Sequence, residues 1–122
     1  MKYVIVGGVA GGAGAAARLR RLEEDTQILM LEQGPYVSYS NCSLPYRLSG
    51  TVDQTEKLVL MDPGKFAAQY NIQARVNSRV TALHRERKAV TVRDLESGRE
   101  YEERYDKLVL ATGAQAVFPP IP

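Results

Sequence analysis

The chain has 122 residues, a length that suits one domain with a modest hydrophobic core. Hydrophobic residues make up 44% and charged residues 25%, and the formal net charge of +2 is too weak to indicate nucleic-acid binding. A single cysteine excludes a disulfide scaffold, and no apolar run approaches the ~20 residues that span a bilayer. The N-terminus lacks a signal-peptide pattern, so we expect a cytoplasmic protein without a membrane or nucleic-acid partner.

The first 31 residues predict a strand, a glycine turn, a helix and a second strand. Residues 2–6 form a β-branched and aromatic run typical of a buried strand. Residues 13–22 are rich in Ala, Leu and Arg, which favours helix, and residues 27–31 are a second apolar run. This order within about thirty residues predicts a βαβ unit with a parallel strand pair.

The next forty residues alternate loops and short helices. After a loop at residues 34–40, we expect a helix over residues 41–48, capped by Asn41 or Cys42 and with Pro45 in its first turn. Residues 58–61 are predicted to be extended. Asp62 and Pro63 then begin a helix that runs to about residue 70, because Asp caps well and Pro suits the first helical position.

The last third of the chain changes to short strands. We expect strands over residues 72–76, 79–87, 89–95, 99–105 and 107–111. Alternation of apolar and polar residues predicts an antiparallel three-strand ribbon over about residues 79–105. The sequence therefore predicts an α/β fold: a parallel sheet of the nucleotide-binding type with helices, plus this ribbon.

Residues 118–122 include three prolines and are typical of an extended connector. Because chains rarely stop on a connector, we expect residues 1–122 to be the N-terminal piece of a longer protein.

The glycine turn at residues 7–12 indicates a dinucleotide site. It keeps the first and last glycines of the G-x-G-x-x-G pattern, Gly7 and Gly12, but has Val9 at the middle position, where Gly11 relieves the backbone approach to pyrophosphate. Glu32 lies twenty residues past Gly12, where an acid accepts hydrogen bonds from ribose hydroxyls and repels a 2′-phosphate. The alternative is that the glycines only permit tight packing. The pattern does not distinguish FAD from NAD.

Cys42 is the candidate reactive residue. A lone cysteine is ordinarily a buried small hydrophobe. Here it lies among Ser40, Asn41 and Ser43 at a predicted helix start, where amide dipoles stabilise a thiolate.

Four segments together resemble the pyridine nucleotide–disulfide oxidoreductase family. They are residues 7–12, residues 31–32, residues 38–46 (Ser-Tyr-Ser-Asn-Cys-Ser-Leu-Pro-Tyr) and residues 105–114. The cysteine segment is the most specific of them. It is similar to the single-cysteine branch of coenzyme A-disulfide reductases, NADH-dependent persulfide or polysulfide reductases, and NADH oxidases and peroxidases.

The resemblance implies a Rossmann-like FAD-binding domain in which Cys42 lies beside the flavin ring. NADH or NADPH would reduce the flavin in the full-length enzyme, which we expect to be a homodimer with NADH and interface domains absent from residues 1–122. The implied cofactor-binding residues are Gly7, Gly8, Val9, Ala10, Gly11, Gly12, Glu32, Gln33, Val80, Ala111, Thr112 and Gly113.

The resemblance also implies a substrate-binding face. Gly14, Arg18 and Arg21 are spaced to share one side of the first helix, which is ordinarily a solvated basic face. In the coenzyme A-disulfide reductases the equivalent positions contact coenzyme A, and Arg binds phosphate in a fork. Ser38 and Asn41 would then border the pantetheine end of a coenzyme A disulfide or persulfide.

Some residues depart from the family pattern. Tyr39 and Ser40 stand where Phe and Ala are common, and Ser43 where Gly or Ala is common. The other functions considered are an NADH oxidase or peroxidase that uses a sulfenic acid at Cys42, and a non-catalytic nucleotide-binding module. His84 is expected to be a surface residue, and no metal site is expected because the chain has one histidine and one cysteine.

Overall fold

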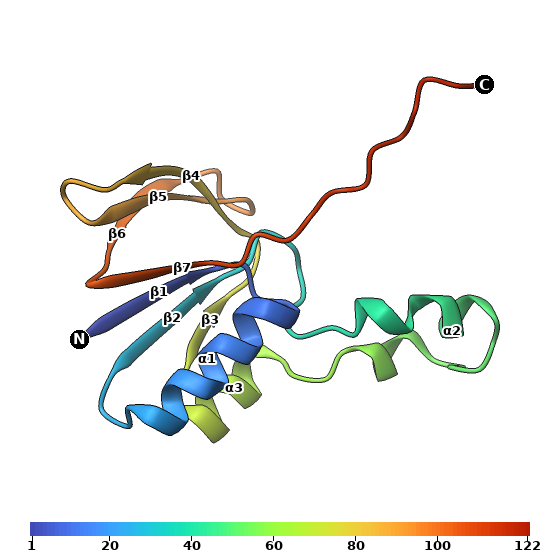
Figure 1. Ribbon diagram of the computed structural model, residues 1–122, viewed down its shortest axis with the longest axis horizontal. Helices are drawn as coiled ribbons and strands as arrows, with labels where there is room; N and C mark the ends of the chain where they lie inside the picture. Colours follow the sequence, from blue (N-terminus) through green and yellow to red (C-terminus); the bar gives the residue numbers. More distant parts are fainter.

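A four-stranded parallel sheet forms the middle layer of the computed structural model, which describes all residues 1–122 (Figure 1). Its strand order is β3-β2-β1-β7. The strands are β1 (Lys2–Val6), β2 (Gln27–Leu31), β3 (Gln73–Arg75) and β7 (Lys107–Leu110). Every pairing between them is parallel, so their carboxyl ends meet at one edge of the sheet. The predicted parallel sheet is confirmed.

Helices α1 (Ala10–Leu22) and α3 (Pro63–Tyr70) cover one face of this sheet (Figure 1). The buried residues between the layers are Ile5, Ala13, Ala16, Ile28, Met30, Val37, Phe66 and Ile72. Helix α1 begins three residues earlier than predicted, because the turn occupies only residues 7–9 and the later glycines are helical. Helix α3 begins as predicted, with Asp62 accepting a hydrogen bond from the Lys65 amide at 2.8 Å.

The second face is covered by an antiparallel sheet of β4 (Ser78–His84), β5 (Ala89–Asp94) and β6 (Glu100–Arg104). Val4, Leu29, Leu31, Val90 and Val92 form the buried core between the two sheets. The predicted ribbon is confirmed, but strand β4 ends at His84 instead of residue 87. The cause is a turn in which Lys88 takes a left-handed backbone, with φ of 49°.

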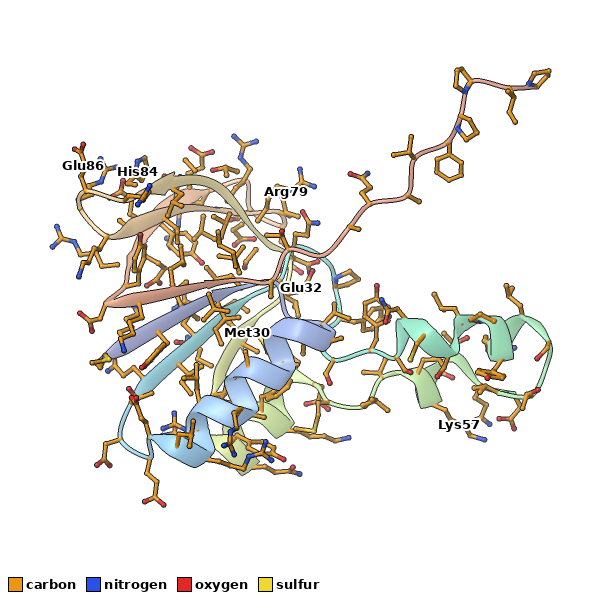
Figure 2. The ribbon with its side chains drawn as sticks, viewed as in Figure 1. Met30, Glu32, Lys57, Arg79, His84 and Glu86 are labelled. Carbon is orange, nitrogen blue, oxygen red and sulfur yellow. The ribbon has the colours of Figure 1, made fainter.

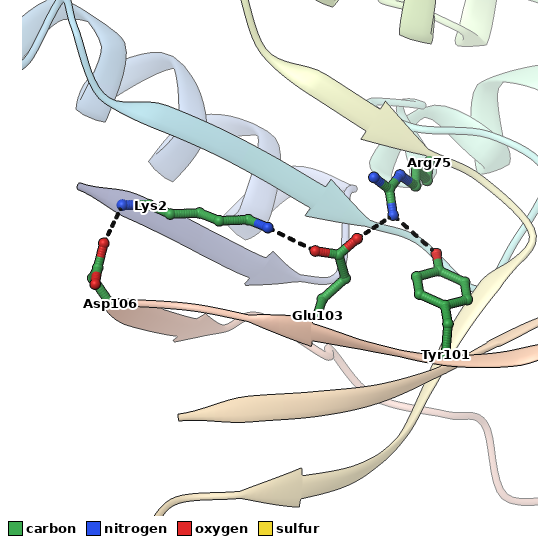
Figure 3. Close-up of polar contacts among 5 residues, drawn as sticks. All are labelled: Lys2, Arg75, Tyr101, Glu103 and Asp106. Atoms are coloured by element: carbon green, nitrogen blue, oxygen red, sulfur yellow. Dashed lines mark hydrogen bonds and ion pairs between the residues drawn. The ribbon is translucent and has the colours of Figure 1, made fainter. Parts of the chain in front are cut away.

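A polar network also joins the two sheets (Figure 3). The Glu103 carboxylate on β6 accepts two hydrogen bonds, each of 2.6 Å. One comes from Lys2 Nζ on β1 and the other from a guanidinium nitrogen of Arg75 on β3. The same Arg75 nitrogen donates to the Tyr101 hydroxyl at 3.1 Å. The Lys2 amide donates to the Asp106 carboxylate at 2.6 Å.

The part of the chain that connects β2 to α3 forms an arm that projects away from the parallel sheet (Figure 1). It contains the 3₁₀ helices η1 (Asn41–Ser43) and η2 (Thr55–Leu58) and the short helix α2 (Leu44–Leu48). The predicted caps were wrong: Ser40 precedes η1 and Ser43 precedes α2, because the expected single helix is split in two. At the base of the arm, Tyr39 bridges Val59 in antiparallel fashion, and this pairing holds residues 38–40 in place.

The chain leaves β7 as an extended segment that points away from the body (Figure 1). None of the helices has both the length and the apolar character needed to cross a membrane.

Candidate functional site

Three elements come into backbone contact at the glycine turn. Gly7 follows β1 with φ of 101°, and a Cβ added there would lie 2.1 Å from the carbonyl oxygen of Ala111 after β7. A Cβ added to Gly12 on α1 would lie 1.7 Å from the Gly7 carbonyl oxygen. No side chain fits such distances, so both glycines are required by the protein's own packing. Gly11 differs, because its added Cβ would make only an ordinary contact, 3.6 Å from Ala111 Cβ.

The Glu32 carboxylate lies buried at the end of β2, and both its oxygens accept backbone hydrogen bonds. Oε2 accepts from the Gly8 amide at 2.7 Å, and Oε1 accepts from the Gly34 amide at 2.8 Å. Glu32 therefore fixes the glycine turn and also faces a cleft at this edge of the sheet. Each carboxylate oxygen has a second lone pair, so both can still accept from a ligand hydroxyl.

A cleft of about 270 Å³ opens at the carboxyl ends of β1, β2 and β7. Its walls include eight of the residues implied as cofactor-binding: Gly7, Val9, Glu32, Gln33, Val80, Ala111, Thr112 and Gly113. Gly8, Ala10, Gly11 and Gly12 form the turn and first helical residues beside it but not its walls.

One charged residue of the cleft wall, Arg79, was not predicted from the sequence. Figure 2 shows Arg79 on β4 and Glu32 at the end of the parallel strands, both close to the point where the chain leaves β7. Arg79 Nε donates to the Gln33 side-chain oxygen at 3.2 Å. An arginine near the start of a strand carries no local signal that it will line a cleft, so only the fold reveals this contact.

The cleft fits the ADP half of a dinucleotide. The amides of Ala10, Gly11 and Gly12 open helix α1 and have no intrahelical acceptor, so they can donate to pyrophosphate. The helix has no side-chain cap to occupy them. Val9 stands at the position of the middle glycine, and its φ of −94° lies outside the left-handed region that favours glycine. The buried carboxylate of Glu32 lines the cleft and has lone pairs that can accept hydrogen bonds from hydroxyl groups.

Cys42 is a free and exposed thiol in η1, so the alternative of a buried small hydrophobe is wrong. Its sulfur lies 3.4 Å from Ser40 Oγ, which in turn lies 2.7 Å from Ser43 Oγ. Hydrogen bonding by Ser40, and to a smaller extent by Ser43, lowers the pKa of the Cys42 thiol below its usual value. The site therefore favours the nucleophilic thiolate form.

A second cavity of about 290 Å³ contains Cys42 in its wall, and its lining is largely hydrophobic. It brings together three of the predicted substrate residues, Gly14, Ser38 and Asn41. Arg18 and Arg21 lie outside this wall. They are exposed on the same helix, and neither forms an ion pair or hydrogen bond. Val9, Tyr39 and Asn41 line both cavities, so the thiol cavity adjoins the cleft at the glycine turn.

His84 lies on the other sheet, where its Nε2 is 2.9 Å from the Thr91 hydroxyl and outside both cavities. No group of three His, Cys, Asp or Glu side chains is arranged to hold a metal ion.

Comparison with known proteins matches residues 1–122 to the family described as "Pyridine nucleotide-disulphide oxidoreductase". Coenzyme A disulfide reductase of Staphylococcus aureus (strain JH9) is 37% identical over 115 residues, which cover 94% of this chain and 26% of that protein. The structure of reduced CoADR-RHD from Bacillus anthracis superposes with a TM-score of 0.95 at 42% identity, over 99% of this chain and 22% of the other. The NAD-dependent persulfide reductase of A. fulgidus gives a TM-score of 0.94 at 38% identity, over 99% and 23% of the two chains.

Proposed function

The chain belongs to the pyridine nucleotide-disulphide oxidoreductase family, and we propose that it is the FAD-binding portion of a disulfide reductase in which Cys42 is the reacting thiol. The family resemblance predicted from the motifs is confirmed, and FAD with NADH or NADPH are the cofactors of this family. The chain spans about a quarter of the curated relative, 26% of its length. In this proposal the NADH and interface domains, and the homodimer, belong to a longer enzyme.

The observation that carries the proposal is the shared wall between the two cavities. Val9, Tyr39 and Asn41 separate a cleft suited to a dinucleotide from a cavity that contains an exposed thiol. When bound, FAD supplies two-electron transfer between a pyridine nucleotide and sulfur. A redox-active sulfur has to lie next to the cofactor for this chemistry, and the proposal is supported by the wall that the Cys42 cavity shares with the cleft.

The proposed substrate class is supported by the relatives and by two exposed arginines on helix α1. The similar proteins act on coenzyme A disulfide and on persulfide, judging by their names. Arg18 and Arg21 extend from α1 without protein partners, so their guanidinium groups are available to phosphate. We assign Gly14, Ser38 and Asn41 to the thiol cavity and the two arginines to the phosphates of coenzyme A.

Cys42 acts as the nucleophile on a substrate disulfide. Its thiolate attacks one sulfur, the substrate S–S bond breaks, and one coenzyme A thiolate leaves while the other half stays bonded to Cys42. In the full-length enzyme, two electrons from NADH or NADPH and one proton would cleave this mixed disulfide, release the second coenzyme A as a thiol and restore the Cys42 thiolate.

Thiol–disulfide exchange with the 122-residue chain tests the substrate part of the proposal, since it needs no flavin. We expect coenzyme A disulfide to add one coenzyme A to Cys42, detected by mass spectrometry, faster than the uncharged hydroxyethyl disulfide does. The Arg18→Ala/Arg21→Ala double variant should remove this preference without changing the rate with hydroxyethyl disulfide. Arg85→Ala, on the distant β4–β5 turn, is the matched control.

Equal rates with both disulfides in the unaltered chain would contradict the coenzyme A assignment. Faster oxidation by hydrogen peroxide to a sulfenic acid than exchange with coenzyme A disulfide would favour the NADH oxidase or peroxidase alternative.

Amide NMR spectra of the labelled chain with added FAD test the cofactor part, because they detect weak binding. Shifted signals should cluster at residues 7–12, Glu32, Val80 and residues 111–113, with the hairpin at residues 85–88 unaffected. Signals that shift elsewhere, or not at all, would oppose the assignment of this cleft to FAD.

A further inference from the structure

Two serines beside Cys42 occupy helix-capping positions without capping. Ser40 precedes η1 and Ser43 precedes α2, yet neither side chain accepts a hydrogen bond from the helix backbone. A serine at such a position ordinarily accepts from an amide two or three residues further on. Here the two hydroxyls bond to each other at 2.7 Å, and Ser40 Oγ reaches the Cys42 sulfur at 3.4 Å. The pair therefore forms a chain of polar contacts that ends at the thiol.

The backbone around Ser40 is fixed by the returning segment of the arm, residues 58–60. The Ser40 amide donates to the Leu58 carbonyl at 2.7 Å, and the Leu60 amide donates to the Ser38 carbonyl at 3.2 Å. Both serines are half-buried, whereas Cys42 is exposed. The hydroxyls are therefore held in place and partly shielded from water, while the sulfur stays open to a reagent.

The charge of the sulfur determines the direction of these hydrogen bonds. A thiolate has no proton and can only accept, so Ser40 must donate to it. The Ser40 oxygen is then free to accept from the Ser43 hydroxyl, and each bond of such a chain strengthens the next.

We propose that Ser43 and Ser40 form a two-hydroxyl relay that donates to the Cys42 sulfur and stabilises its anionic form. Ser40 touches the sulfur, and Ser43 is a positioning residue that acts through Ser40. This inference rests on the proposed role of Cys42 as the reacting thiol, and it names the groups that hold the reacting anion.

The pH dependence of alkylation of the 122-residue chain by iodoacetamide tests the relay. The rate is measured by mass spectrometry between about pH 5 and about pH 10, a range that spans the titration of a cysteine thiol. Ser40→Ala should move the midpoint to higher pH and lower the rate at pH 7 by about two- to tenfold, the range of one net hydrogen bond. The rate at the high-pH plateau should stay the same or rise, because a more basic thiolate is a better nucleophile.

Ser43→Ala should move the midpoint in the same direction but less. The Ser40→Ala/Ser43→Ala double variant should behave like Ser40→Ala alone, because Ser43 has no effect without Ser40. Ser49→Ala is the matched control, since this hydroxyl lies on the same arm but bonds to the Tyr46 carbonyl and Thr51. Circular dichroism confirms that each variant is folded.

A changed plateau with an unchanged midpoint in Ser40→Ala would mean that the hydroxyl only limits access, and the relay would be wrong. Additive midpoint shifts in the double variant would also overturn it, because Ser43 would then act on the sulfur independently. Failure of the proposed function is distinguished by the exchange experiment: a chain that does not react with coenzyme A disulfide can still show the midpoint shift.

Discussion

The Glu32 carboxylate holds the glycine turn through the amide of Gly8, which lies 2.7 Å from Oε2. Its other oxygen binds the Gly34 amide, so one buried side chain ties the start of α1 to the loop after β2. An acid at this position is thus a structural part of the cleft as well as a candidate ribose ligand.

Glu32→Gln should lower the free energy of unfolding by about 1–3 kcal/mol, because the new NH₂ group faces a backbone N–H and leaves a buried donor unpaired. Urea unfolding at pH 7 measures the loss. Glu86→Gln, at an exposed position without a polar partner, should change stability little. A loss of the same size in both variants would refute a specific role for the Glu32 carboxylate.

Two glycines of helix α1 should respond in opposite ways to the same substitution. Gly12→Ala places a methyl group against the Gly7 carbonyl, so we expect a loss of at least about 3 kcal/mol. Gly14 has no atom within 4 Å of an added Cβ, so Gly14→Ala should stabilise the helix by about 0.5–1 kcal/mol. Thermal unfolding of the two variants provides the test, and equal effects would contradict the close packing at Gly12.

The βαβ unit was predictable because its signals are local. The apolar runs at residues 2–6 and 27–31 match strands β1 and β2, and Asp62 caps α3 as its residue type predicts. The start of α1 was not predictable, because Gly11 and Gly12 are poor helix formers and yet lie within the helix, where Gly12 packs against the Gly7 carbonyl.

The site was less predictable than the fold. Cys42 and Glu32 have motif signals, but Ser40 and Ser43 resemble ordinary polar loop residues until the arm positions them. The role of Arg20 was not predictable either, because the sequence does not distinguish this residue from Arg21. Its acceptors include carbonyl oxygens about fifty residues away, at Tyr70 and Asn71.

Arg20→Met should therefore destabilise the chain, whereas Arg21→Met should not. The Arg20 guanidinium donates to the carbonyl oxygens of Thr26, Tyr70 and Asn71, each at 2.8 Å, and so ties α1 to the end of α3. We expect a loss of about 2 kcal/mol for Arg20→Met, the scale of hydrogen bonds from a charged group. Urea unfolding of both variants gives the comparison, and an unaffected Arg20→Met protein would show that these bonds contribute nothing net.

The stability that Glu103 contributes at the contact between the two sheets should decrease at acidic pH. Burial raises the pKa of its carboxyl, but hydrogen bonds from Lys2 and Arg75 outweigh this, and the pKa is lowered below its usual value. A carboxylate with a lowered folded-state pKa contributes stability above the unfolded pKa of about 4.3, and this contribution is lost as pH falls through the folded-state pKa.

Glu103→Gln should cost about 1–2 kcal/mol at pH 7, because the side chain is only 14% exposed and pairs with two cations. The difference between the variant and the unaltered chain should shrink as pH falls below about 4, where Glu103 is protonated in the unfolded state and then in the folded state. Urea unfolding across this pH range measures it. Glu100→Gln is the control, since its exposed pair with Arg93 should be worth less than about 0.5 kcal/mol at every pH. A Glu103→Gln difference that stays constant with pH would mean that the side chain acts through packing and not through its charge.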